Sequence, residues 1–218
     1  MNVNQIKAKI EEYKALGKTL FTSSSFQTHS IPLLHILSQI DRTIPVYFLN
    51  TGYHFPETLT FKDQIANMLG LNLINLKPET PKVMQLDPDG KLLFTSDPEH
   101  CCFLNKTQPM ERVMLQYDVW INGIRGDQNA NRSAMQSEQT AKHGIIRFHP
   151  IIDWKNKEIY EYRMKYNLPE HPLESKGYLS IGCEPCTRKL DPEMDARESR
   201  WYGLNKTECG INTDLVNN

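Results

Sequence analysis

The sequence lacks the features of a membrane protein or a nucleic-acid-binding protein. No apolar run approaches the roughly 20 residues of a membrane span, and the polar opening residues lack the long apolar core of a secretory signal peptide. Charges nearly cancel, with 25 basic and 26 acidic side chains, so no excess of positive charge indicates a nucleic-acid surface. Internal repeats and low-complexity segments are absent as well. We therefore expect a cytoplasmic protein with one domain, or with one domain and a functional tail.

Cysteine is scarce, and its odd count argues against a disulfide framework. The five residues are an adjacent pair, Cys101 and Cys102, a Cys-Glu-Pro-Cys pair, Cys183 and Cys186, and a single Cys209. Adjacent cysteines cannot easily bond to each other, and paired cysteines in the cytosol more often bind metal or do redox work. The two pairs supply the four thiolates that a tetrahedral zinc ion or an iron–sulfur cluster needs. Cys209 lies among small and polar residues, where a substrate can reach a thiol; inert, buried thiols are the alternative.

Short apolar runs alternate with helical patterns along most of the chain. Apolar stretches predict strands over residues 19–22, 46–49, 71–76, 119–122 and 145–149. Helical spacing of apolar side chains predicts helices over residues 6–13, 31–37, 56–69 and 154–164. Strands that alternate with helices predict an α/β fold with a mostly parallel sheet and helices on both faces. Ligands bind such sheets beyond the carboxyl ends of the strands.

Two turns that follow strands are rich in small and polar residues. Ser23, Ser24 and Ser25 come directly after the first strand and directly before a helix. Hydroxyls and backbone N–H groups at a helix N-terminus can bind an anion, although serine is also an ordinary helix cap. This loop has no Walker lysine. The turn at residues 50–58 follows the second strand in the same way and strengthens the prediction, whereas we interpret His54 within it as a packing or hydrogen-bonding residue.

Three arginines are candidates for binding an anion. Arg125 follows the fourth predicted strand, which would place it on the same edge of the sheet. Arg197 and Arg200 are three residues apart and share one face if that stretch is helical. Guanidinium groups suit the bidentate recognition of phosphate or sulfate. Surface ion pairs with nearby glutamates are the alternative for each arginine.

Motifs spread over most of the chain carry a family resemblance. They lie at residues 23–26, 51–58, 123–128, 150–154, 171–173, 177–188 and 208–211. Together with the two cysteine pairs and the Glu-Cys-Gly sequence at residues 208–210, they resemble the assimilatory sulfonucleotide reductases. These enzymes reduce adenylyl sulfate (APS) or its 3′-phosphorylated form (PAPS) to sulfite. The resemblance runs from about Thr19 to Ile211.

The resemblance implies a fold and a set of site residues. The fold would be related to the adenine-nucleotide α hydrolases of the PP-loop group, with a nucleotide-binding reductase domain at residues 1–200 and a mobile C-terminal tail at residues 201–218. One [4Fe–4S] cluster per subunit would be held by the paired cysteines, Cys101, Cys102, Cys183 and Cys186. Cys209 would be the catalytic nucleophile. The substrate-binding residues would be Ser23, Ser24, Ser25, Arg125, Arg197 and Arg200. One position departs from the family pattern, because Asn212 stands where a histidine is usual.

The resemblance also implies a reaction. Cys209 would attack the sulfur of APS and expel AMP, and the resulting S-sulfocysteine would be reduced by thioredoxin or a similar dithiol. The sulfite would serve sulfate assimilation and cysteine biosynthesis. The cluster cysteines favour APS, whereas the serine-rich loop resembles the loops of PAPS enzymes, so PAPS use or dual use is the alternative.

Two other functional classes remain open from the sequence. A PP-loop RNA-thiolating enzyme would need a Ser-Gly-Gly-x-Asp-Ser loop that this chain lacks, and a basic surface that its net charge of −1 does not indicate. A metal-binding regulator that uses the four cysteines as a zinc or redox sensor would leave the serine loop and Cys209 without a role.

Overall fold

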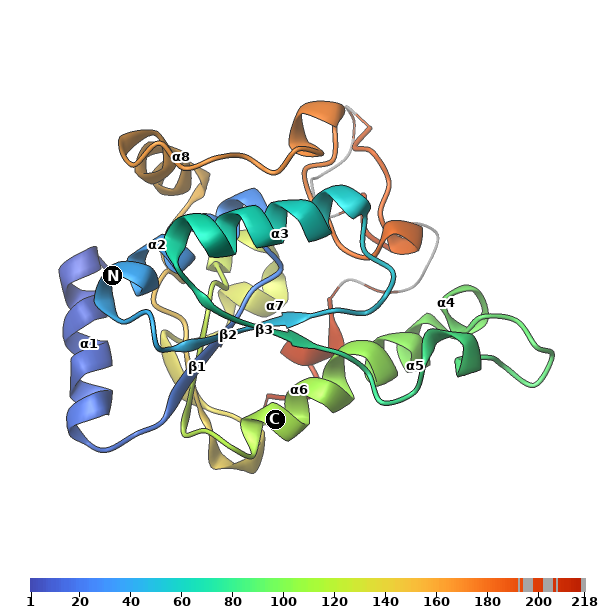
Figure 1. Cartoon of the computed structure of the whole chain (residues 1–218), viewed down its shortest axis with the longest axis horizontal. Coiled ribbons are helices and arrows are strands. Elements are labelled where there is room, and N and C mark those ends of the chain that lie inside the picture. Colours follow the sequence, from blue (N-terminus) through green and yellow to red (C-terminus); the bar gives the residue numbers. More distant parts are fainter. Residues whose placement is uncertain (192, 194–197, 202–205, 207, 217–218) are drawn as a thin grey trace.

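The computed structural model describes residues 1–191, 193, 198–201, 206 and 208–216. Within these residues a six-stranded sheet has the order β3-β2-β1-β4-β6-β5 (Figure 1). In that order the strands are Asn72–Leu76, Pro45–Leu49, Leu20–Ser23, Val119–Asn122, Ile146–Phe148 and Glu138–Thr140. Neighbouring strands pair in parallel, except that β5 runs antiparallel to β6. The predicted α/β fold with a mostly parallel sheet is therefore confirmed.

Helices lie on both faces of this sheet. They are α1 (Val3–Ala15), α2 (Ile31–Ile40), α3 (Pro56–Leu69), α4 (Leu93–Ser96), α5 (Pro98–Cys102), α6 (Gln108–Met114), α7 (Ala130–Ser133) and α8 (Asn156–Lys165). A π-helical turn, η3 (Phe103–Thr107), joins α5 to α6. Shorter 3₁₀ turns are η1 (Thr28–Ser30), η2 (Lys82–Met84), η4 (Gly126–Gln128), η5 (Lys142–Gly144), η6 (Glu174–Lys176), η7 (Glu184–Cys186) and η8 (Gly210–Asn212). Among the described residues, no helix combines the length and apolarity that crossing a membrane requires.

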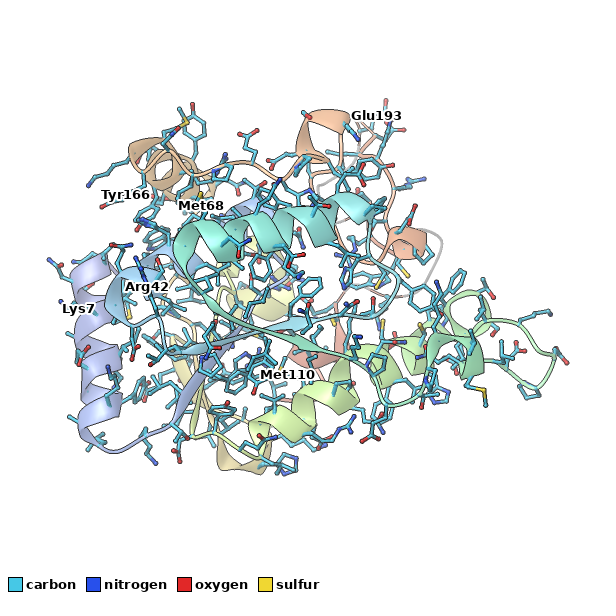
Figure 2. All side chains as sticks on the ribbon, in the orientation of Figure 1. Lys7, Arg42, Met68, Met110, Tyr166 and Glu193 are labelled. Atoms are coloured by element: carbon cyan, nitrogen blue, oxygen red, sulfur yellow. The ribbon has the colours of Figure 1, made fainter. Side chains whose placement is uncertain are left out.

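Alternating side chains along the strands divide the core between the two faces. In β2, Val46 and Phe48 pack with residues of α2 and α3, whereas Tyr47 packs on the opposite face with α6. Figure 1 shows α2 and α3 on one side of the sheet and α6 on the other. Met110 of α6, labelled in Figure 2, is fully buried against the sheet. Because both faces are covered, the central strands consist largely of apolar residues.

The strand order reverses next to β1, and this reversal positions the site. The chain passes from β1 outward through β2 to β3, then returns to the other side of β1 to form β4. Ser23 and Asn122 are paired in register at the carboxyl ends of β1 and β4. Open α/β sheets bind ligands at such a point, because the connections leave the two strand ends in opposite directions and leave a crevice between them.

One strand departs from the sequence analysis. Residues 138–140, Glu-Gln-Thr, lie in a polar stretch without alternating apolar side chains, and so they gave no strand signal. They form β5 because pairing with β6 satisfies their backbone, and the Glu138 carboxylate accepts a hydrogen bond from the Tyr13 hydroxyl. Tertiary contacts therefore decide the conformation of this segment.

Candidate active site

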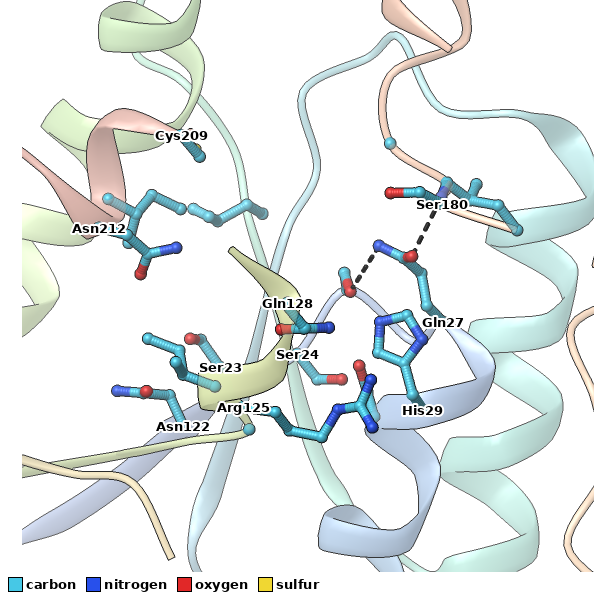
Figure 3. Close-up of a pocket in the computed structure, with 18 of the residues that line it drawn as sticks. Ser23, Ser24, Gln27, His29, Asn122, Arg125, Gln128, Ser180, Cys209 and Asn212 are labelled. Atoms are coloured by element: carbon cyan, nitrogen blue, oxygen red, sulfur yellow. Dashed lines mark hydrogen bonds between the residues drawn. The ribbon is translucent and has the colours of Figure 1, made fainter. Parts of the chain in front are cut away.

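A cavity of about 540 Å³ opens at the carboxyl ends of the central strands. Its size lies within the range of pockets that hold small ligands. Five of the six residues predicted to bind substrate line it, together with the predicted nucleophile: Ser23, Ser24, Ser25, Arg125, Arg200 and Cys209. Arg197 lies outside the described residues. Figure 3 shows Cys209 on one side of the cavity and Gln27 on the other, with Arg125 at the bottom of the view beside His29.

The serine loop presents hydroxyl donors to this cavity. The Ser23 oxygen accepts a hydrogen bond from Trp120 Nε1 at 2.9 Å, and the Ser24 oxygen accepts one from the backbone N–H of Phe26 at 3.0 Å. A hydroxyl that accepts from the protein keeps its own hydrogen to donate. The loop turns sharply at buried Phe26, whose φ of 54° lies in the left-handed region. These donors suit an anionic ligand.

Arg125 is buried and only partly satisfied. Its Nη2 donates to Asn156 Oδ1 at 2.8 Å, and Nη1 lies 3.5 Å from Asp127 Oδ2. Nε and Nη1 are buried without a hydrogen-bond partner among the described residues. Burial lowers the pKa of the guanidinium, which the nearby Asp127 carboxylate opposes. A buried guanidinium with unused donors beside a cavity favours the binding of an anion there.

Arg200 reaches the cavity from an extended segment. Its backbone forms an antiparallel bridge with Thr187, so the described part of this region does not have the helical conformation considered from the sequence. The Nη1 atom donates to the carbonyl of Ile181 at 3.1 Å, and the guanidinium lies 4.6 Å from the centre of the Trp201 ring. It also lies directly against Gly182, where a Cβ atom would overlap it. Glycine at position 182 therefore makes room for Arg200.

Arg147 is a site residue that the sequence analysis missed. It lies in β6, is fully buried and lines the cavity, with its guanidinium 4.4 Å from the centre of the Trp120 ring. Its Nη2 donates to Asn212 Oδ1 at 2.8 Å and its Nη1 donates to the carbonyl of Ile211 at 3.2 Å. Burial lowers its pKa to about 10. Arg147 could have been identified from the sequence, because it is a charged residue in the middle of a predicted buried strand.

The four paired cysteines line a second, smaller pocket beside the cavity. All are free thiols; Cys101, Cys102 and Cys183 are buried, and Cys186 is half-buried. Burial, together with the neighbouring thiols, raises the pKa of Cys101 to about 12. A metal centre binds cysteine as the thiolate, and its positive charge would offset the charge of four such ligands in this pocket. Across the described ranges, no three metal-binding side chains converge closely enough to hold a single ion.

Two of these sulfur atoms accept hydrogen bonds from buried side chains. The Thr51 hydroxyl lies 3.3 Å from Cys183 Sγ and accepts from the N–H of Tyr53, which leaves its hydrogen for the sulfur. The Asn105 amide lies 3.6 Å from Cys101 Sγ and is fixed by Gln85, whose oxygen is 2.6 Å away. Such contacts orient sulfur ligands and stabilise their negative charge.

Lys106 connects the pocket of the paired cysteines to the cavity, because it lines both. Burial disfavours its charged form, but Cys183, Cys209 and Cys102 raise the pKa of its ammonium above the ordinary value for lysine. Lys106 lies outside the motifs identified from the sequence. Its position four residues after Cys102, at helical spacing, was the available signal.

Cys209 is half-buried and lines the cavity. Its N–H donates to the Glu208 carboxylate at 2.9 Å, and its carbonyl accepts from the N–H of Asn212 at 2.8 Å. The following turn, η8, packs against η3, the π-helical turn that carries Lys106. The single cysteine, the serine loop and the arginines therefore meet around one cavity.

Comparison with known proteins identifies relatives of this chain. A protein of Chelativorans sp. (strain BNC1) named adenosine 5′-phosphosulfate reductase is 41% identical over 191 residues, covering 87% of this chain and 77% of that protein. A protein of Gloeobacter violaceus named phosphoadenosine 5′-phosphosulfate reductase is 35% identical over 205 residues, covering 92% and 85%.

The fold is similar to the crystal structure of phosphoadenylyl-sulfate (PAPS) reductase from Candida auris, solved as a phosphate complex. The TM-score is 0.66 at 21% identity, covering 84% of this chain and 94% of that chain. Residues 19–189 match the family described as the phosphoadenosine phosphosulfate reductase domain. The chain therefore belongs to the phosphoadenosine phosphosulfate reductase family, a family of oxidoreductases that act on sulfur groups.

Proposed function

We propose that this protein reduces adenosine 5′-phosphosulfate (APS) to sulfite and AMP, with Cys209 as the nucleophile. The observation that carries the proposal is that Cys209 lines the same cavity as the serine hydroxyls and the arginines. A phosphosulfate group is an anion that needs many donors, and this cavity supplies them. Relatives that carry the name adenosine 5′-phosphosulfate reductase support APS as the substrate.

The first step is a displacement at sulfur. The Cys209 thiolate attacks the sulfate sulfur and forms an S–S bond, while the bond from that sulfur to the bridging oxygen breaks and its electron pair leaves with AMP. Arg125, Arg200 and the serine hydroxyls bind the phosphosulfate and stabilise the charge that develops on the leaving phosphate. Lys106, whose ammonium interacts with Cys209, places positive charge beside the nucleophile.

The second step is reduction by a dithiol, for which we propose thioredoxin. One thiolate of the dithiol attacks Cys209 Sγ, so that sulfite leaves with the S–S electron pair and a mixed disulfide remains. The second thiol then attacks this disulfide and releases Cys209. The dithiol supplies both electrons, and sulfur passes from sulfate to sulfite oxidation level. For both partners to reach Cys209 in turn, we propose that residues 201–218 act as a tail that moves relative to the domain at residues 1–200.

We propose that Cys101, Cys102, Cys183 and Cys186 hold one [4Fe–4S] cluster per subunit. Their fit to this group rests on four thiols that line one pocket, since cysteine thiolates are the ligands of such clusters. Hydrogen bonds from Thr51 and Asn105 suit thiolate ligands. Such a cluster would supply structural stability, and the positive charge of its core would offset the ionisation of the four thiols.

PAPS is the alternative substrate. A relative 35% identical to this chain is named phosphoadenosine 5′-phosphosulfate reductase, and the serine loop offers hydroxyls that could bind a 3′-phosphate. That phosphate adds roughly two negative charges, so it needs further donors beyond those that bind the phosphosulfate. The two substrates are therefore compared directly in the experiment that follows.

The test is a sulfite-release assay with reduced thioredoxin and, in separate reactions, APS and PAPS. We expect sulfite from APS with the wild type and none with Cys209→Ser, while the variant keeps its iron content and nucleotide affinity. Sulfite release by Cys209→Ser at a rate near that of the wild type would overturn the assignment of the nucleophile. No sulfite from either nucleotide with the wild type would overturn the proposed function.

A further inference from the structure

Glu208, the residue before Cys209, has a buried carboxylate that joins the C-terminal segment to the rim of the cavity. Its side chain is 1% exposed. Arg132 binds it with two donors, Nε to Oε2 at 2.7 Å and Nη2 to Oε1 at 3.1 Å. Asn129, at the start of α7, donates from Nδ2 to Oε2 at 2.8 Å. Two side chains at α7 therefore hold a carboxylate that lies 76 residues from Arg132 in the sequence.

The same carboxylate also fixes the backbone of the nucleophile. Its Oε1 accepts from the N–H of Cys209 at 2.9 Å and from Asn212 Nδ2 at 3.3 Å. Asn212 is held in turn by Arg147, whose Nη2 donates to its Oδ1 at 2.8 Å. Oε1 therefore links Arg132 of α7 directly to the N–H of Cys209.

The charge of Glu208 is balanced where it lies. A carboxylate beside a thiol disfavours the thiolate, because like charges repel. The bidentate pair with Arg132 neutralises this carboxylate, so docking of the segment adds no net negative charge to the cavity. A bidentate arginine–carboxylate pair also fixes the relative orientation of the two groups, in addition to the distance between them.

We propose that Glu208 is a positioning residue for Cys209, docking the thiol at the cavity through Arg132 and Asn129. This inference rests on the proposed function, in which Cys209 attacks the substrate. Glu208 acts through Arg132, Asn129 and the N–H of Cys209, and so it sets where the Cys209 backbone lies. Its loss should therefore slow the attack without weakening nucleotide binding.

The experiment measures the first step alone, with the variants Glu208→Gln and Asp214→Asn. The second is a matched control, since Asp214 is an exposed carboxylate in the same segment whose Oδ1 accepts from Thr213. Nucleotide is added without reductant, and the S-sulfo adduct on Cys209 is followed by mass spectrometry in single turnovers. Nucleotide Kd and the rate of Cys209 alkylation by iodoacetamide are measured on the same samples.

For Glu208→Gln we expect adduct formation about 10- to 100-fold slower, as small misplacements of a reacting group produce. The nucleotide Kd should stay within about threefold of the wild type, and alkylation should be faster because the thiol is no longer docked. Asp214→Asn should match the wild type in all three measurements. Adduct formation by Glu208→Gln at the wild-type rate, or a loss that appears wholly in the Kd, would overturn the proposal.

A second variant covers the case in which Glu208→Gln unfolds. Asn129→Ala removes one donor to the same carboxylate. It should also slow adduct formation and speed alkylation, but by less than Glu208→Gln does. If this variant forms the adduct and is alkylated at the wild-type rates, the proposal is contradicted. Failure of the proposed function is distinguishable, because the wild type itself would then form no adduct on Cys209.

Discussion

Gly210→Ala is expected to disturb the docking of the nucleophile through one steric contact. Gly210 follows Cys209 at the start of η8 and is buried against η3. A Cβ atom there would lie 2.7 Å from the Thr107 hydroxyl oxygen and 2.5 Å from Asp214 Oδ2. Gly210 is not among the residues with positive φ, so alanine adds no backbone strain. Asp214 is exposed and can rotate away, whereas Thr107 is buried.

The size of the effect follows from this contact. Ordinary van der Waals contact begins at 3.4 Å, so the segment must move by about 0.7 Å away from Thr107. Displacements of about 1 Å can slow a reaction by about 100-fold, and overpacking typically costs about 1–3 kcal/mol. We therefore expect adduct formation on Cys209 to slow by about 10- to 100-fold. Iron content and nucleotide affinity should remain close to those of the wild type.

The assay is the single-turnover formation of the adduct, with Thr107→Ala as a rescue. Thr107→Ala alone should react at nearly the wild-type rate, since the buried Thr107 hydroxyl has no hydrogen-bond partner among the described residues. In the Gly210→Ala background, the same change removes the clashing atom and should restore most of the rate. A Gly210→Ala variant as fast as the wild type, or one that Thr107→Ala fails to rescue, would refute this reasoning.

Three further predictions concern the metal site, the pH dependence and the substrate. Serine in place of any of the four paired cysteines should lower both iron content and the free energy of unfolding, because metal-binding energy is also folding energy; full activity in iron-free protein contradicts the cluster. Burial lowers the pKa of His149 from 6.5 to about 4, so the stability it contributes is present above pH 6.5 and is lost as the pH falls through 4. That shift corresponds to about 3 kcal/mol of unfolding free energy. In denaturant titrations, His149→Gln should therefore lose less stability than the wild type between pH 7 and pH 4. Equal losses would contradict the lowered pKa of His149. The ratio of kcat/KM for APS to that for PAPS should exceed one, and a value well below one would assign PAPS as the preferred substrate.

The architecture could be predicted because its signals are local. Apolar runs such as residues 46–49 indicated buried strands, and Pro56 indicated the start of α3, which begins at that residue. The alternation of strands and helices then predicted a parallel sheet with a crevice at the carboxyl ends. Ser23 and Arg125 line that crevice because Ser23 ends β1 and Arg125 follows β4, whose carboxyl ends lie there.

The remaining site residues depend on contacts between distant parts of the chain. The pairing of Arg132 with Glu208 has no local signature, because each residue alone has the appearance of a surface charge. Lys106 acquires its place only when the two cysteine pairs come together. Arg200 was considered on a helix, but pairing with Thr187 holds it in an extended conformation. Backbone pairing of this kind overrides local preference, and one sequence does not reveal it.

Direct detection of the covalent intermediate tests the central proposal, that Cys209 attacks the substrate. The reduced protein is mixed with APS in the absence of a dithiol, digested and mapped by mass spectrometry. The account predicts one sulfonate group on the peptide that contains Cys209, its release as sulfite when reduced thioredoxin is added, and no such group in Cys209→Ser. A sulfonate on another residue, or sulfite formed by Cys209→Ser without any adduct, would contradict it.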